Sequence, residues 1–249
     1  MRPVSKRDDL SWLFNIRNRP SPICTSNDAV KIFHSCEWEE PEAADRLIWD
    51  AENCSWNQKS TTVRVMRKVL GSGKKYGCML MYDVLEQMVY VLKAGLGIYE
   101  NNAFDSVRTQ SMASNVAIKY NEEGPTMKIH ILPCWVYILK GRDRNPAIRT
   151  EPLIVGPYCK IDPRSDVADA SLSNLSIEQQ RQHYLAELEA INLFELFSYH
   201  ESDHQFIIWN PLRLGEHGSS SVVYWTEPSY FSVDGAGGTF DSGLSGLNA

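Results

Sequence analysis

Apolar residues recur at helical spacing in two long segments of the chain. Between Tyr76 and Lys93 they stand at positions 81, 84, 85, 88 and 92, and Gly95 follows as a candidate C-terminal cap. Between Ile177 and Phe197 they recur with a similar period, and Ser176 with Gln179 matches the signature of a capping box. Both segments are predicted to be amphipathic helices that face the same core.

Two shorter helices are predicted nearer the beginning of the chain. The run Ser26–Asp28 supplies natural N-cap residues for a helix through Phe33. Pro41, at a first-turn position and followed by an acidic residue, suits a second helix that ends near Glu52.

Strands are predicted where β-branched and apolar residues replace the helical period. Ser60–Leu70 is rich in Thr and Val and ends at the turn Gly71–Gly73. Val116–Tyr120 and Met127–Leu139 flank the turn signal Asn121–Pro125 and predict an antiparallel hairpin, with Pro133 forcing a bulge or an edge position. Further strands are predicted at Leu153–Ile161, Gln205–Trp209 and Val222–Trp225.

These elements predict an α+β fold, in which an antiparallel sheet packs with two or more amphipathic helices. The predicted organisation is an N-terminal helical and charged segment over residues 1–58 and an α+β core domain over residues 59–231. A flexible, disordered Gly/Ser-rich tail follows over residues 232–249, because its composition offers little apolar surface to offset the entropy of ordering it.

Composition restricts the function classes. Hydrophobic residues make up 43% of the 249 residues, which is ample for a core, and the formal net charge of -6 does not favour general attraction to nucleic acid or anionic lipid. The chain shows no apolar run of signal-peptide or membrane-spanning length, so we expect an intracellular protein with reduced thiols. Cys134 lies near His130, and buried packing is favoured there over a nucleophile with its base.

One local basic stretch departs from this acidic background. No acidic residue falls between Lys59 and Asp83, and the stretch predicts a polyanion-binding surface, with a merely solvated basic face as the alternative. The turn Gly71–Lys75 evokes a phosphate loop but lacks the leading glycine spacing and the Ser or Thr after the lysine, so it is interpreted as a turn with exposed lysines. The basic residues of the predicted surface are Lys59, Arg64, Arg67, Lys68, Lys74 and Lys75.

His200, Glu201 and His204 match the H-E-x-x-H pattern, in which two histidines bind zinc and the glutamate polarises a water molecule. The motif falls where the late helix is predicted to end, and Ser202 and Asp203 between the histidines are poor helix formers. A polar turn is therefore favoured, with neither a metal nor a cofactor. A zinc-dependent hydrolase that uses His200 and His204 is kept as the alternative function.

The order of elements from Ser60 onward resembles that of rhabdovirus matrix proteins. The resemblance is closest from Tyr184–Ala190 through Phe194–Phe197 to Phe206–Trp209, which is similar to the helix, short turn and Trp-ended strand of that family. It implies a non-enzymatic viral structural protein that self-associates as a homo-oligomer and bridges the viral nucleocapsid to an acidic membrane surface. The resemblance further implies a location in the virion, and in the host cytoplasm or nucleus at the membrane periphery.

Overall fold

The computed structural model describes residues 23–72, 76–96, 102–155, 176–209, 212–214, 222–235, 241 and 243. The chain divides into two compact units. The first unit comprises Met1–Phe104 and Cys134–Gly156, and the second comprises Asp105–Pro133 and Pro157–Ala249. Neither unit is a continuous segment, because the chain passes between them after residues 104, 133 and 156.

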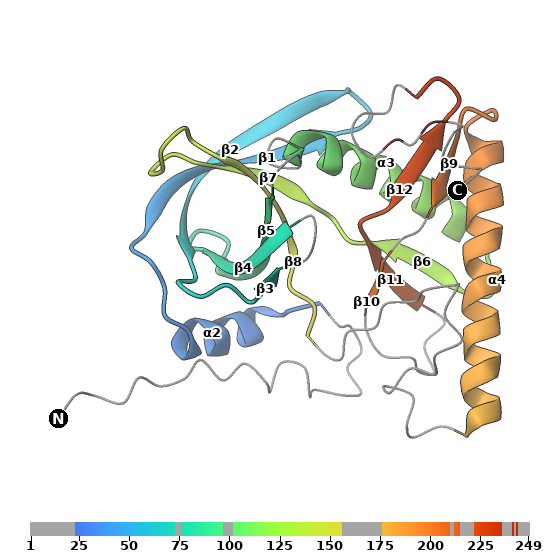
Figure 1. The fold of residues 1–249 in the computed structure, drawn as a ribbon, viewed down its shortest axis with the longest axis horizontal. Helices are drawn as coiled ribbons and strands as arrows, with labels where there is room; N and C mark the ends of the chain where they lie inside the picture. The colour runs from blue at the N-terminus through green and yellow to red at the C-terminus, as the bar shows by residue number, and fades with distance from the viewer. Residues whose placement is uncertain are drawn as a thin grey trace. The chain divides into compact units, whose positions relative to one another are not determined.

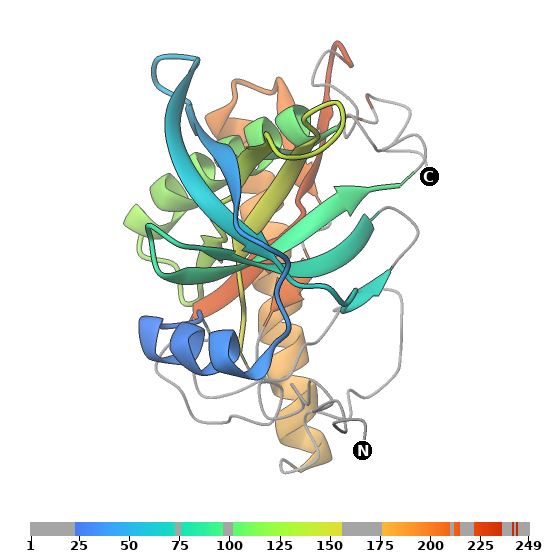
Figure 2. The same ribbon diagram turned by 90° about the vertical axis from the view of Figure 1, so that its left-hand side faces the viewer.

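The first unit is built on one antiparallel sheet in the strand order β2-β1-β7-β8-β5-β4-β3. An additional pairing of β2 with β4 closes this sheet on itself, and the strands curve round a common centre (Figures 1 and 2). Within the described residues, six strands therefore form a closed, barrel-like sheet, and the short β3 extends it beyond β4. The strands are β1 (Glu42–Asp50), β2 (Ser55–Val65), β3 (Gly71–Ser72), β4 (Tyr76–Asp83), β5 (Met88–Gly95), β7 (Trp135–Leu139) and β8 (Ala147–Pro152).

Alternating side chains give this sheet two packed faces. Met81 on β4 joins the buried cluster inside the closed sheet, whereas its neighbour Leu80 packs outside it against Ile32 of helix α2 (Ser26–Ser35). Helix α2 begins at a capping box in which Thr25 and Asp28 exchange hydrogen bonds. The inner face and α2 thus bury both sides of β4.

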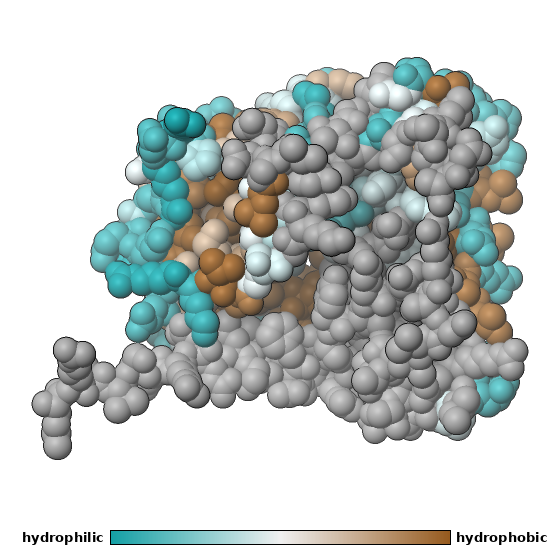
Figure 3. All heavy atoms as spheres, viewed as in Figure 1, coloured by the Kyte–Doolittle hydropathy of each residue, from teal (hydrophilic) through white to brown (hydrophobic). Residues whose placement is uncertain are grey.

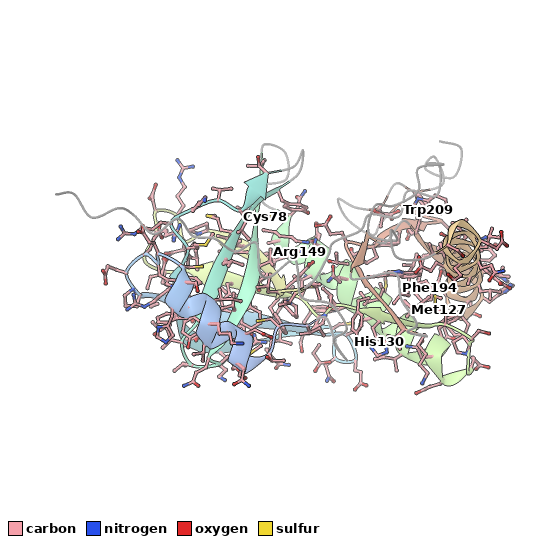
Figure 4. The ribbon with its side chains drawn as sticks, turned by 90° about the horizontal axis from the view of Figure 1, so that it is seen from below. Cys78, Met127, His130, Arg149, Phe194 and Trp209 are labelled. Atoms are coloured by element: carbon pink, nitrogen blue, oxygen red, sulfur yellow. The ribbon has the colours of Figure 1, made fainter. Side chains whose placement is uncertain are left out.

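The second unit contains most of helix α3 (Ala103–Glu122) and all of helix α4 (Ile177–Glu201). Its described strands form the sheets β10-β11-β6 and β12-β9. Phe194 of α4 packs with Tyr120 of α3 and Trp225 of β11, and Figure 4 labels Phe194 and Met127 in this cluster. The strands are β6 (Lys128–Ile131), β9 (Phe206–Trp209), β10 (Leu212–Leu214), β11 (Val222–Thr226) and β12 (Ser229–Ser232).

Several predicted elements are confirmed. Helix α2 is present, and α4 begins at the predicted capping box, in which Ser176 and Gln179 exchange hydrogen bonds. Strands β9 and β11 lie where the sequence predicts them, and Pro133 separates β6 from β7. Within the described residues, no helix is long and apolar enough to cross a membrane.

The predicted fold class, an α+β fold in which an antiparallel sheet packs with two or more amphipathic helices, is wrong, because the main sheet is a closed, barrel-like sheet of six strands. The predicted helix at 76–93 is the hairpin β4–β5, and the predicted helix at 41–52 is β1. The predicted strand at 116–120 is the end of α3, and the end of the predicted strand at 153–161 lies outside the described residues.

Burial along α4 does not follow the apolar residues that recur at helical spacing. Phe194, Ala190, Glu187 and Ser198 are buried, whereas three leucines of the helix are exposed. Figure 3 shows apolar side chains among polar ones along α4 at the right-hand edge of the view. The exposed leucines are Leu185, Leu193 and Leu196.

The predicted division at residues 58 and 231 stays a prediction. Ser232 ends strand β12, and its backbone N–H donates to the Asp241 carboxylate at 2.9 Å.

Candidate functional site

Three charged side chains meet on two adjacent strands of the first unit. Lys93 on β5 lies opposite Arg149 on β8, and Glu151 follows two residues along on the same face of β8. The Lys93 Nζ atom is 2.8 Å from Glu151 Oε2, and Arg149 Nη2 forms an ion pair with Glu151 Oε1. Each oxygen of the carboxylate therefore meets a different cation.

This charged cluster is buried. The side chain of Lys93 is 11% exposed, and those of Arg149 and Glu151 are each 3% exposed. Buried charges carry a large desolvation cost, which close pairing only partly offsets, and clusters of this kind concentrate at functional sites. The burial and the pairing together mark β5 and β8 as the candidate site.

Two further side chains border the cluster. The guanidinium carbon of Arg149 lies 5.9 Å from the centre of the Tyr76 ring. Cys134 is buried, and desolvation raises the pKa of its thiol to about 12, with smaller effects from Arg149 and the other charges of the cluster. The thiol is therefore protonated at neutral pH, and the predicted buried packing of Cys134 is confirmed.

A glycine hairpin lies one strand away from Lys93. Gly71 of β3 pairs with Cys78 of β4, and Cys78 in turn pairs with Lys93 on β5. Figure 4 labels Cys78 and Arg149, which lie on the strands at either side of β5. A Cβ atom added at Gly71 or at Gly77 would meet no described atom within 4 Å, so these glycines leave open space where a ligand can approach the backbone.

A glycine hairpin next to a strand lysine is chemically suited to phosphate groups. Backbone N–H groups at glycines approach phosphate oxygens closely, and an ammonium group supplies positive charge. The carboxylate of Glu151 fixes the position of the Lys93 ammonium group. The arrangement can therefore orient a polyphosphate ligand.

The sequence patterns did not reveal this cluster. Lys93, Arg149 and Glu151 are single charges set in apolar or mixed runs, and the register of two strands brings them together. The available signal was a lysine that directly follows the apolar run Val89–Leu92, at a position where burial makes a charge costly.

The predicted polyanion-binding residues lie elsewhere on the first unit or outside the described residues. Lys59 pairs with Glu86 at 2.8 Å, and Arg64 donates to the backbone oxygen of Glu39 at 3.4 Å. Arg67 and Lys68 are exposed, whereas Lys74 and Lys75 lie outside the described residues. This polyanion-binding surface stays a prediction.

The H-E-x-x-H residues lie at the end of helix α4 and in the turn that follows it. His200 lies in the last turn of α4, and His204 lies beyond the helix end, with a positive φ of 65°. Glu201 pairs with Lys119, and the ring of His204 packs against Tyr199 at 4.6 Å. Nowhere in the described part of the chain do three or more His, Cys, Asp or Glu residues gather in a group that could hold a metal ion.

Comparisons with known proteins match the chain to one family model and to one fold. A family model described as the alpha-kinase family matches residues 66–248. The alpha-kinase domain of myosin-II heavy chain kinase A, solved with a phosphorylated aspartate, matches with a TM-score of 0.63 at 21% identity, covering 84% of this chain and 91% of that one. No curated protein matches the sequence.

Two nucleotide complexes of that domain match similarly. The complex with AMP-PNP has a TM-score of 0.63 at 21% identity, and covers 84% of this chain and 89% of that one. The complex with ADP has a TM-score of 0.61 at 21% identity, with coverages of 84% and 91%. These matches show that the chain has the fold of that domain.

The resemblance to rhabdovirus matrix proteins is therefore wrong. It depended on the pattern of the segment that forms α4 and β9, and a helix followed by a short strand is common to many folds. The non-enzymatic structural role, the viral nucleocapsid and the acidic membrane as partners, and the zinc-dependent hydrolase are overturned by the same family match.

Proposed function

Because the chain belongs to the alpha-kinase family, we propose that it binds ATP and transfers the γ-phosphoryl group to a hydroxyl group of a protein substrate. The observation that carries this proposal is the buried ion pair of Lys93 with Glu151 beside the glycine hairpin of β3 and β4. All of these residues fall within the matched range 66–248.

The geometry assigns a task to each part of the site. In protein kinases a glycine-rich loop covers the nucleotide phosphates, and a strand lysine, paired with a glutamate, contacts the α- and β-phosphates. In this chain the hairpin that contains Gly71 and Gly77 would cover the phosphates, and Lys93 would contact them. Until the nucleotide binds, Glu151 on the neighbouring strand β8 would hold Lys93 in place.

The matched domain supports this assignment through its nucleotide complexes. Myosin-II heavy chain kinase A has been solved with AMP-PNP and with ADP in the same fold. Kinases also use Mg²⁺ to neutralise the phosphates. We assign no residue to a metal ion, because the described residues contain no group of three or more candidate ligands.

The proposal is tested by ATP binding and by phosphoryl transfer. We expect Lys93→Met to weaken ATP binding by about tenfold or more, because one charge-assisted contact to phosphate is lost, and to abolish transfer of labelled phosphate. Binding is measured by calorimetry with Mg·ATP. Transfer is measured to the protein itself and to a mixed peptide library that contains Ser, Thr and Tyr.

Lys59→Met is the matched control. Lys59 is also a strand lysine 2.8 Å from a glutamate, but its side chain is 58% exposed and lies on β2. This variant is expected to retain ATP binding. A wild-type protein that neither binds ATP nor transfers phosphate would contradict the proposal, as would equal losses in the two variants.

A further inference from the structure

The task assigned to Lys93 and Glu151 leaves Arg149 without a role, although Arg149 meets the same carboxylate. We propose that Arg149 is a positioning residue that keeps Glu151 paired and in place when Lys93 turns from Glu151 to the phosphates of the nucleotide. This inference rests on the proposed nucleotide site and adds a third residue to it.

The geometry separates the two cations on Glu151. Lys93 Nζ lies at Oε2, whereas Arg149 Nη2 lies at Oε1, so one cation can leave without displacing the other. Arg149 stands on the central strand of three, because its backbone pairs with Lys93 on one side and with Val136 on the other. Its planar guanidinium group also faces the ring of Tyr76. Arg149 is therefore held firmly, while Lys93 carries its charge on a flexible four-carbon stem.

Burial makes this second cation important. A glutamate that is 3% exposed and paired with Lys93 alone would be left without its cation once Lys93 moved to a phosphate. Removing one partner of a buried ion pair leaves an uncompensated buried charge, and the free-energy cost of that charge would oppose nucleotide binding. With Arg149 on the other oxygen, Glu151 keeps a cation throughout. Arg149 therefore acts on the nucleotide through Glu151.

A double-mutant cycle tests this chain of action. Affinity for Mg·ATP is measured for the wild type, Arg149→Gln, Glu151→Gln and the double variant. We expect Arg149→Gln to weaken binding by about tenfold when Glu151 is present and by less than about twofold in the Glu151→Gln background. Affinity for adenosine, which carries no phosphate, should stay within about twofold in all four proteins, because Lys93 acts only on phosphates.

Two other roles for Arg149 give different results. If Arg149 contacted the phosphates directly, its loss would weaken ATP binding equally in both Glu151 backgrounds. If its role were only to stabilise the fold, adenosine and ATP affinities would fall together. Either result overturns the inference.

A conservative variant and a matched control complete the test. Arg149→Lys keeps a positive charge but loses the planar guanidinium group with its several N–H donors. We expect about a threefold loss of ATP affinity in this variant, and no loss in the Glu151→Gln background. If Arg149→Gln does not fold, the cycle with Arg149→Lys replaces the first one. No loss, or a loss that persists, would count against the inference. Arg46→Gln removes another buried arginine of the same sheet, one that lies 4.2 Å above the Trp135 ring, and should lower the melting temperature without changing ATP affinity.

The failure of the inference can be told apart from the failure of the proposed function. A wild type that does not bind ATP overturns both. A wild type that binds ATP through Lys93, together with additive effects of Arg149→Gln and Glu151→Gln, overturns the role of Arg149 alone.

Discussion

Asp83 shows how one buried side chain organises the closed sheet. Its Oδ1 atom accepts hydrogen bonds from the Thr61 hydroxyl at 2.8 Å and from the backbone N–H groups of Leu85 and Glu86 at 3.0 and 3.1 Å. Its Oδ2 atom accepts from the Tyr137 hydroxyl at 2.8 Å. Burial raises the pKa of Tyr137, so the phenol remains a donor over the physiological pH range. One carboxylate thus joins β2, the β4–β5 turn and β7.

Replacing this carboxylate should be costly. Asp83→Ala removes the acceptor for four donors, and we expect a loss of about 3 to 5 kcal/mol in the free energy of unfolding, because buried donors without acceptors are strongly destabilising. Urea unfolding of the variant measures the loss. Asp143→Ala is the control, since the Asp143 side chain is 97% exposed and should change stability by less than about 0.5 kcal/mol. A loss below about 1 kcal/mol at Asp83 would show that the network contributes little.

At the scale of elements, local sequence motifs predicted the end of a helix correctly where the motif's own hydrogen bonds form that end. The capping box at Ser176 and Gln179 identified the start of α4, because both hydrogen bonds form within a single turn. The buried face of α4 was not predictable in the same way, because apolar side chains occur on more than one side of the helix. Burial there depends on the partners Tyr120 and Trp225, which lie far away in sequence.

The spacing of apolar residues gave a wrong secondary structure where the same residues fit both a helix and a strand. In the segment 76–93 the apolar residues match a helical face, but they also form two short continuous runs, Cys78–Met81 and Met88–Leu92, as in strands that are buried on both faces. Helix α3 was missed because its buried positions include the polar residues Ser106, Thr109 and Gln110, which weaken an apolar stripe. The candidate site was missed for a related reason, since a strand register that no local pattern records brings Lys93 to Glu151.

A pair of substitutions separates the hairpin from the predicted helix. Leu80 is fully buried on β4, so Leu80→Ala should cost about 2 to 5 kcal/mol of unfolding free energy. Leu85 is 61% exposed at the turn, so Leu85→Ala should change it by less than about 0.5 kcal/mol, although the helical pattern predicts that Leu85 is buried. Chemical denaturation of both variants decides between the two structures, and a large loss at Leu85 would favour the helix.

At the scale of the whole molecule, each unit is built from two segments that are separated in the sequence. Helix α3 and strand β6 come before residue 134, but they pack on Phe194 and Trp225, which come after residue 176. The closed sheet of the first unit takes all its described strands from residues before 157. The last third of the chain therefore contributes to the core of the second unit, and it supplies none of the described strands of the closed sheet.

Truncation after residue 156 tests this dependence. We expect amides of α3 to lose their protection from hydrogen exchange, because the core beside them is removed, whereas amides of β5 and β8 stay protected. Hydrogen exchange is measured by mass spectrometry in the full and truncated chains, with peptides from 105–120 reporting on α3 and peptides from 88–95 reporting on β5. Loss of protection in β5 to the level of α3 would show that the closed sheet needs the second unit in order to fold.

The closing contact of the sheet has a consequence for the behaviour of the protein in concentrated solution. Strands β2 and β4 pair through Val63–Val65 and Met81–Asp83, the segment that Asp83 anchors, and one backbone hydrogen bond extends the pairing on each side, from Met66 N–H to Leu80 O and from Val84 N–H to Thr62 O. Opening this short seam would leave two strand edges with unpaired N–H and C=O groups, and such edges recruit strands from other molecules. Molecules with a weakened seam would therefore aggregate through intermolecular β-sheet pairing before they unfolded completely. The paired residues Val63–Val65 and Met81–Asp83 thus also help to keep the protein in solution.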